Sequence, residues 1–295
     1  MSDIYNAIGI KKQSFHQMLE RRNSVQEEKG QILYLVDQIR NDHPRMSVRD
    51  IYQKLNLLTI GRDKFEALCY ANGYRVARKT NYRRTTDSSG VTRFPNRIKG
   101  IEVTGVNQVF VSDITYFEIR NRFYYLTFIM DLFNREIVGF NASESLRAEQ
   151  TTLPSLYMMV KERGKANLKG AIIHSDGGGQ YYARELIRET NELNMINSMT
   201  EESVYENAHA ERLNGVIKNN YLYPYDPSDF NDLKKKLKKA VRMYNTEKGH
   251  RALGGKTPVQ YKSERGFETV DNNPCYLPFS TTLHQHQKIT KSCLI

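Results

Sequence analysis

The chain has 295 residues, and its 44 lysines and arginines outnumber 33 aspartates and glutamates, which gives a formal net charge of +11. A mean hydropathy of −0.65, without any run near the roughly 20 apolar residues that a spanning helix needs, argues against a membrane protein. Three scattered cysteines are too few for a disulfide framework or a four-ligand zinc site. We therefore expect a cytoplasmic protein with reduced cysteines and without an export signal. Its length suits two or three domains.

The positive charge is concentrated in the first third of the chain. Residues 1–99 carry 19 basic against 10 acidic side chains, a net of +9, whereas the other 196 residues carry 25 against 23, a net of +2. Clustered cations attract polyanions, of which nucleic acid is the commonest, although a solvated linker has the same composition. The stretch with the densest positive charge, residues 75–99, contains a single acid, Asp87. Its basic residues are Arg75, Arg78, Lys79, Arg83, Arg84, Arg93, Arg97 and Lys99.

The first 80 residues show helical patterns and no strand pattern. We expect a first helix-turn-helix unit within residues 1–44, with helices at 4–8 and 11–21 joined at Gly9. A second unit within 45–80 would place a helix over 48–55, capped by Ser47, before a helix over 62–70. Such units read DNA with their second helix, although any small helical bundle gives a similar pattern. Residues 81–99 have no apolar periodicity and are interpreted as a basic linker.

From residue 100 the pattern changes to that of an α/β domain, which we place at 100–265. Strands rich in β-branched and aromatic residues are expected at 109–118, 123–132 and 136–141, as a three-stranded antiparallel meander. Helices at 148–163, 183–193, 207–219 and 229–244 and strands at 170–174 and 196–199 follow. This order is that of a ribonuclease-H-like core with added parallel strands and helices on both faces, although order alone leaves other α/β folds open. Residues 266–295 are expected to be a loose tail.

Three acids occupy positions in this pattern where a carboxylate needs a cation. Asp113 lies within an apolar strand, Asp176 ends a strand before three glycines, and Glu211 lies on a helix. That helix carries Asn207, Glu211, Asn214 and Lys218 on one polar face, because they are four, three and four residues apart. Each acid alone has an ordinary structural explanation, and the rival Asp131 is expected to serve a turn with Asn134. Together, the three carboxylates would suit Mg²⁺, which prefers oxygen ligands.

Several motifs resemble the integrase catalytic core of bacterial insertion-sequence transposases of the DDE class. They are Phe110-Val111-Ser112-Asp113-Ile114-Thr115-Tyr116, His174-Ser175-Asp176-Gly177, Asn207-Ala208 leading to Glu211, and Tyr244-Asn245 through His250 to Thr257-Pro258. The resemblance covers about residues 100–265, and residues 42–55 resemble the helix-turn-helix before that core in the OrfB type. It implies a fold like that of retroviral integrases, with Asp113, Asp176 and Glu211 as the metal-binding triad.

The resemblance also implies the cofactors and the partners. Two Mg²⁺ ions per site are expected, with Mn²⁺ as a substitute, and the expected partner is double-stranded DNA, both the element's terminal repeats and the target. Lys218 would lie against the DNA end, beside Asn207 and Asn214, while Arg83, Arg84, Arg93 and Arg97 would bind DNA from the linker. A homo-oligomer on DNA is expected, and an upstream helix-turn-helix partner protein remains an alternative to acting alone.

The sequence therefore predicts a Mg²⁺-dependent polynucleotidyl transferase that binds element ends and catalyses DNA cleavage and strand transfer. Two alternatives belong to other classes. The first is a DNA-binding regulator or a catalytically inactive transposase remnant, against which the intact acids at positions 113, 176 and 211 argue. The second is a structure-specific nuclease, which would cleave DNA without joining it.

Overall fold

The computed structural model describes residues 9, 11–76, 94–201, 207–265 and 275–276. The helical part begins the described chain and consists of α2 (Lys12–Asp42), α3 (Val48–Leu55) and α4 (Arg62–Ala71). The Ser47 hydroxyl accepts a hydrogen bond from the Asp50 backbone N–H at 3.1 Å, as expected of an N-cap. Ile51 of α3 and Phe65 of α4 are fully buried in one small core. The helices of the second predicted unit are thus confirmed.

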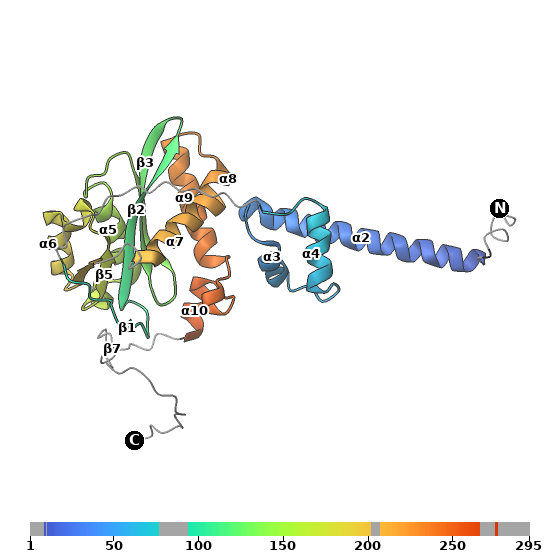
Figure 1. Cartoon of the computed structure of the whole chain (residues 1–295), viewed down its shortest axis with the longest axis horizontal. Helices are drawn as coiled ribbons and strands as arrows, with labels where there is room; N and C mark the ends of the chain where they lie inside the picture. Colours follow the sequence, from blue (N-terminus) through green and yellow to red (C-terminus); the bar gives the residue numbers. More distant parts are fainter. Residues whose placement is uncertain (1–8, 10, 77–93, 202–206, 266–274, 277–295) are drawn as a thin grey trace, which may run out of the picture.

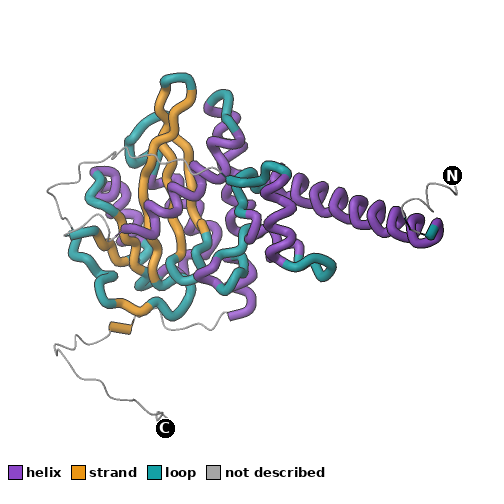
Figure 2. The backbone as a smooth tube through the Cα atoms, turned by 45° about the vertical axis from the view of Figure 1, so that its right-hand side comes forward, coloured by secondary structure: helices purple, strands orange, loops and turns teal. Residues whose placement is uncertain are grey.

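The first predicted unit has a different structure. The expected short helix at 11–21 is part of the 31-residue helix α2, and the expected helix at 4–8 lies outside the described residues. Gly30 alone among residues 12–42 is a strong helix breaker, and the helix ends just before Pro44. Ile32 and Val36 pack against α3 and α4, while the preceding half of α2 projects away from the rest of the molecule (Figures 1 and 2).

Only the end of the predicted linker is described, and it lies on the α/β domain. Phe94 packs against the core, the Asn96 N–H donates to a Glu201 carboxylate oxygen at 2.7 Å, and the Arg97 N–H donates to the Ser198 hydroxyl at 2.8 Å. Residues 81–93, including Arg83, Arg84 and Arg93, lie outside the described residues. Within residues 94–99, the backbone is therefore held by side chains of the domain that follows.

The α/β domain is built on one five-stranded sheet with the order β4-β3-β2-β5-β6. The first three strands form the predicted antiparallel meander, whereas β5 and β6 add in parallel. This arrangement confirms the predicted ribonuclease-H-like fold. The strands are β2 (Val109–Ile119), β3 (Arg122–Asp131), β4 (Ile137–Ser143), β5 (Ile172–Ser175) and β6 (Ile196–Met199).

Helices cover both faces of this sheet (Figure 1). On one face α5 (Thr152–Arg163) and α6 (Arg184–Glu192) bury Leu156, Met159 and Leu186 against the strands. On the other face α7 (Ala208–Ile217) and α9 (Phe230–Thr246) bury a second cluster that includes Leu213 and Leu237. Short turns η1 (Lys165–Leu168) and η2 (Gly179–Tyr182) flank β5, and the π-helical turn η4 (Lys218–Leu222) with α8 (Tyr223–Tyr225) follows α7.

The described chain ends with short elements on the edge of this domain. They are η5 (Arg251–Leu253), α10 (Pro258–Arg265) and β7 (Cys275–Tyr276), which pairs antiparallel with β1 (Ile101–Glu102). The tail expected to be loose therefore contains one strand pairing, which the sequence did not indicate because two residues carry no periodicity. None of the described helices combines the length and the apolar character that crossing a bilayer requires.

Candidate active site

Strand register brings two of the predicted acids to the same level of the sheet. The parallel pairing of β2 and β5 matches Phe110 with Ile173 and Val111 with His174. Asp113 and Asp176 each follow two residues after the last of these pairs, so they stand side by side where the two strands separate. Alternate side chains share a face, so Asp113 lies on the same face as Val111, which packs in the cluster under α7 and α9.

Helix α7 lies along β2 and presents its polar face to that strand. The Asn207 amide donates to the Ser112 carbonyl at 2.9 Å, the Asn214 amide donates to Asp113 Oδ2 at 2.7 Å, and Lys218 Nζ donates to Thr115 Oγ1 at 2.7 Å. The spacing of four, three and four residues thus forms one face, as the sequence indicates. Glu211 lies between Asn207 and Asn214 on this face, in the first turn of α7.

The Asp113 carboxyl is held by two donors within this arrangement. Its Oδ1 accepts the backbone N–H of Ile114 at 2.8 Å, and its Oδ2 accepts the Asn214 amide. The Asp176 Oδ1 accepts the backbone N–H of Gly178 at 3.1 Å. A Cβ on Gly178 would lie 3.1 Å from that carboxylate oxygen, so the small residue keeps the loop close to the acid.

The surroundings of Asp113 disfavour the charged form of its carboxyl. Burial and the negative charge of Asp176, with a smaller contribution from Glu211, raise the pKa of Asp113 to about 8. Burial also raises the pKa of Asp176, against a lowering by the Gly178 N–H. Burial lowers the pKa of the Lys218 ammonium, and Asp113 opposes that change. The cluster of Asp113, Asp176 and Glu211 is therefore short of positive charge.

A divalent cation fits the chemistry of this group. Three carboxylates supply the hard oxygen ligands that Mg²⁺ prefers. A cation would offset the burial and the negative charge of Asp176, which together raise the pKa of Asp113. Within the described part of the chain, no three histidine, cysteine, aspartate or glutamate side chains lie close enough to hold a metal as they stand. Glu211 is exposed, so its carboxylate would have to turn toward the two aspartates to complete such a site.

The structure gives the two asparagines other partners than the DNA contacts expected from sequence. Asn207 and Asn214 are 2% and 5% exposed, and both donate to β2. Buried amides bonded to a strand position that strand, and the contact of these two residues with DNA stays a prediction. Sequence reasoning had no signal for Thr115, the partner of Lys218, because a threonine in a strand is ordinary.

The rival acid Asp131 belongs to a structural cluster. It is fully buried, accepts the backbone N–H of Phe133 at 3.0 Å and that of Asn107 at 2.8 Å, and lies 3.7 Å from Arg163. The prediction that it serves the turn is confirmed, although Asn134 bonds to Glu136 and to the Pro258 carbonyl instead. Asp131 therefore has its own donors away from the three acids.

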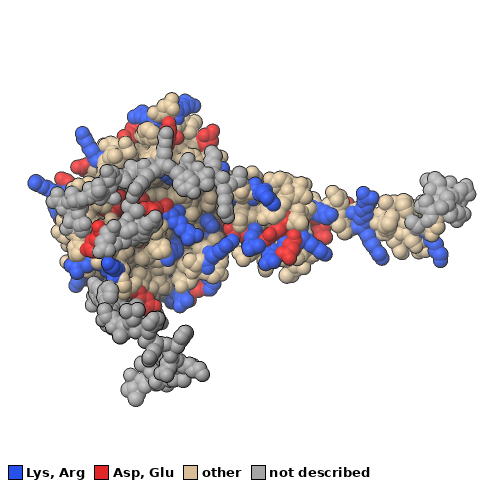
Figure 3. Space-filling model, viewed as in Figure 1, with Lys and Arg blue, Asp and Glu red and all other residues tan. Residues whose placement is uncertain are grey.

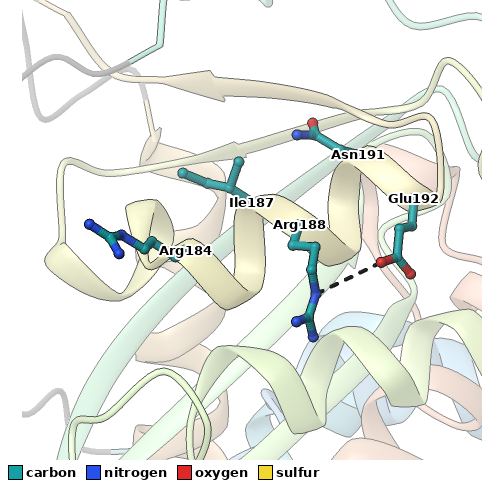
Figure 4. A pocket seen from close by; sticks show the side chains of 5 residues that line it. All are labelled: Arg184, Ile187, Arg188, Asn191 and Glu192. Carbon is teal, nitrogen blue, oxygen red and sulfur yellow. Dashed lines mark ion pairs between the residues drawn. The ribbon is translucent and has the colours of Figure 1, made fainter.

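A pocket of about 560 Å³ lies elsewhere, on the outer side of α6 (Figure 4). Four of its five lining residues have polar side chains, and Arg188 Nε lies 3.8 Å from Glu192 Oε1 across one helical turn. None of the predicted site residues lines it. The lining residues are Arg184, Ile187, Arg188, Asn191 and Glu192.

Family models describe most of the domain that carries these acids. Residues 103–202 match the Integrase core domain, and residues 197–258 match a second model of the Integrase core domain. Together with the sheet order, these matches define the class as a ribonuclease-H-like integrase core.

Several curated relatives specify the family further. An uncharacterized transposase-like protein of Haemophilus influenzae is 32% identical over 166 residues, which are 55% of this chain and 73% of the relative. The insertion element IS600 31 kDa protein of Shigella sonnei is 28% identical over 213 residues, 71% of this chain and 77% of the relative. The putative transposase InsK for insertion sequence element IS150 of Escherichia coli is 25% identical, covering 56% of this chain and 58% of that protein. The chain belongs to the insertion-sequence transposase family of the DDE class.

Solved structures give a more distant likeness. The magnesium complex of the HTLV-2 integrase catalytic core, in its trimeric form, matches with a TM-score of 0.45 and 20% identity, over 54% of this chain and 97% of that one. The catalytic core of BIV integrase matches with a TM-score of 0.43 and 14% identity, over 54% of this chain and 95% of that one.

Proposed function

We propose that this transposase cleaves DNA at the ends of an insertion element and joins the exposed 3′ hydroxyl to a second phosphodiester. The observation that carries the proposal is the juxtaposition of Asp113 and Asp176 by strand register, with Glu211 on the helix that packs over them. Burial and the negative charge of Asp176 raise the pKa of Asp113, and a carboxyl in such surroundings supports a cation-binding role.

In this proposal Asp113, Asp176 and Glu211 hold Mg²⁺, for which Mn²⁺ substitutes. Two such ions would activate the attacking water or hydroxyl and stabilise the leaving oxygen of an in-line displacement. The chain's own residues bind and orient: Asn214 holds Asp113 by its amide, and Asn207 holds the β2 backbone beside it. Burial and the charge of Asp176 raise the pKa of Asp113 to about 8, so a cation bound at this carboxylate would compete with a proton.

DNA would approach along the cations nearest this site. Lys218 lies on η4 with its ammonium 2.7 Å from Thr115 Oγ1, and a phosphate would satisfy its charge better than a hydroxyl does. Arg97 is exposed at the described end of the linker, and we keep Arg83, Arg84 and Arg93 as proposed DNA ligands of the same segment. We further propose that a homo-oligomer holds two element ends together, with an upstream helix-turn-helix partner as the alternative.

The test uses a supercoiled plasmid that carries the gene and its native flanks. With Mg²⁺, the wild-type protein should nick DNA at two discrete flanking positions and form joined products, whereas EDTA should prevent both. Glu211→Gln should abolish cleavage and leave binding to the flanks nearly unchanged. Glu118→Gln, which removes an exposed acid of β2, is the matched control and should cleave normally.

The outcomes separate the alternatives. Nicks that persist in Glu211→Gln would remove this residue from the metal site. Tight binding to the flanks without any cleavage by the wild type would favour a DNA-binding regulator or inactive remnant, and cleavage without joined products would favour a nuclease.

A further inference from the structure

Four cations from distant parts of the sequence lie close enough to act on one another electrostatically, beside the helix that carries Glu211. Arg135 lies in the turn before β4, Arg212 follows Glu211 on α7, and Lys248 and Arg251 lie in the loop after α9. The end of α9, just before this loop, is anchored to the sheet by Asn245, whose side chain forms hydrogen bonds with both backbone groups of Ile137 at 3.0 and 2.9 Å. Ile137 is two residues from Arg135, so these two hydrogen bonds hold the end of α9 and the loop after it close to the turn that carries Arg135.

The loop is built rigidly at this point. The rings of Tyr244 and His250 meet edge to face at 4.6 Å, and the Lys248 N–H donates to the Met243 carbonyl at 2.9 Å. A Cβ on Gly249 would lie 2.3 Å from the Gly255 carbonyl oxygen, so this loop closes on itself without room for a side chain. Lys248 and Arg251 are therefore presented from a fixed backbone.

Asp131 and Asp50 act through space on Arg135 and Lys248, but neither acid forms an ion pair with this cluster. None of Arg135, Arg212, Lys248 and Arg251 forms an ion pair with a described carboxylate, whereas Arg122 pairs with Glu144 at 2.8 Å. The Arg135 Nη1 atom is buried and has no hydrogen-bond partner among the described residues. Among the described residues, the Lys248 ammonium donates to the Gly249 carbonyl at 3.4 Å. Burial and the charges of Arg212 and Arg251 lower the pKa of Lys248, against a raising effect of Asp50.

An arrangement of this kind is unfavourable in the free protein. Like charges held together in partly buried positions cost stability unless an anion binds between them. Guanidinium groups match the geometry of phosphate oxygens especially well. Figure 3 shows lysine and arginine side chains over the part of the core where α7 and α9 lie, close to acidic side chains. An anion bound here would therefore lie next to the helix that carries Glu211.

We propose that Arg135, Arg212, Lys248 and Arg251 form a phosphate-binding site for the DNA backbone as it passes the carboxylate site. The identity of the anion as DNA rests on the proposed function. Arg212 neighbours Glu211 in α7, so a phosphate held there would fix the strand relative to the catalytic helix. The contacts are to phosphates and carry no base readout, so the site acts on any DNA sequence.

The test is the salt dependence of binding to a random-sequence DNA duplex in EDTA, where no cleavage is possible. Each phosphate contact adds about 0.9 to the slope of log affinity against log salt. The triple substitution Arg212→Gln, Lys248→Gln and Arg251→Gln should lower that slope by about 2.7, from three contacts of about 0.9 each. Arg184→Gln with Arg188→Gln, on α6 at the opposite face of the sheet, is the control and should change the slope far less.

A second measurement excludes a merely structural role. Because the cations repel one another, the triple variant should melt no lower than the wild type, whereas residues that hold the fold together would lower the melting temperature when replaced. The exposed single changes Arg212→Gln and Arg251→Gln test the same point without touching the half-buried lysine. A slope equal to that of the wild type, or a fall no larger than in the α6 control, would overturn the site.

The phosphate site and the catalytic proposal can fail separately. If the plasmid assay shows no cleavage but the slope falls, the phosphate site stands and the catalytic proposal fails. If cleavage proceeds and the slope is unchanged, the catalytic proposal stands and the phosphate site fails.

Discussion

Replacing Asp113 by asparagine should make the free protein more stable, and the gain should depend on pH. In the folded protein the pKa of this carboxyl is raised to about 8, from an ordinary value of 3.8. Folding therefore favours the protonated form, so the contribution of Asp113 to stability is highest below pH 4. It is lost progressively as the pH rises toward 8.

The magnitude follows from that shift. Relative to a side chain that stays neutral, the ionisable Asp113 should lower the free energy of unfolding by about 1.5 kcal/mol at pH 5 and by about 4 kcal/mol at pH 7. This loss should level off above pH 8. The amide keeps the shape of the protonated acid, and Asn214 Oδ1, which has no partner among the described residues, is free to accept from it. After allowing for imperfect hydrogen bonds, we expect Asp113→Asn to gain about 2 kcal/mol or more at pH 7.

Urea unfolding in EDTA at pH 5, 7 and 8 measures this difference. A gain of 2 kcal/mol corresponds to a rise in melting temperature of about 4 to 8 °C for a domain of this size. Mg²⁺ should stabilise the wild type and leave the variant unchanged, because binding to the folded state raises its stability. Glu118→Gln is the control for removing a charge from β2. A variant that is no more stable than the wild type at pH 8, or a gain that is the same at all three pH values, would refute the reasoning.

Two further changes test how the parts of the chain are held. His43 is 2% exposed and joins the helical part to the domain, since its ring nitrogens lie 3.1 Å from the Tyr221 hydroxyl and 3.4 Å from a Glu247 carboxylate oxygen. His43→Ala should cost about 2 to 3 kcal/mol in urea unfolding at pH 7.5. Burial lowers the pKa of His43, so the contribution of His43 to the free energy of unfolding is present above about pH 6.5 and is lost on acidification. An unchanged stability in the variant would show that this junction is not needed. Gly139→Ala should lower the free energy of unfolding by more than about 3 kcal/mol, because the new Cβ would lie 2.2 Å from the Ser155 carbonyl oxygen. A normal melting temperature in calorimetry would contradict this tight packing of β4 on α5.

Local patterns in the sequence determined most of the elements. The alternation around Asp113, the run before Asp176 and the Ser47 cap depend on neighbours a few residues away, so strands, helices and their order could be predicted. The resemblance of the motifs then pointed to the three acids. The prediction of a short helix at 11–21 was wrong, because it made the turn at Gly9 part of a compact helix-turn-helix unit. Residues 12–42 contain no strong helix breaker other than Gly30, and they form one long helix.

Only the tertiary structure decided which side chains face one another. The register of β5 on β2 places Asp176 beside Asp113, and the packing of α7 turns Asn214 toward Asp113. The cations at positions 135 and 248 are more than a hundred residues apart, and each looks like an ordinary surface charge in the sequence. A chain's local pattern sets which backbone forms, because that depends on nearby residues. The electrostatics of a site depend on distances through space, and these are fixed only when the sheet and its helices pack together.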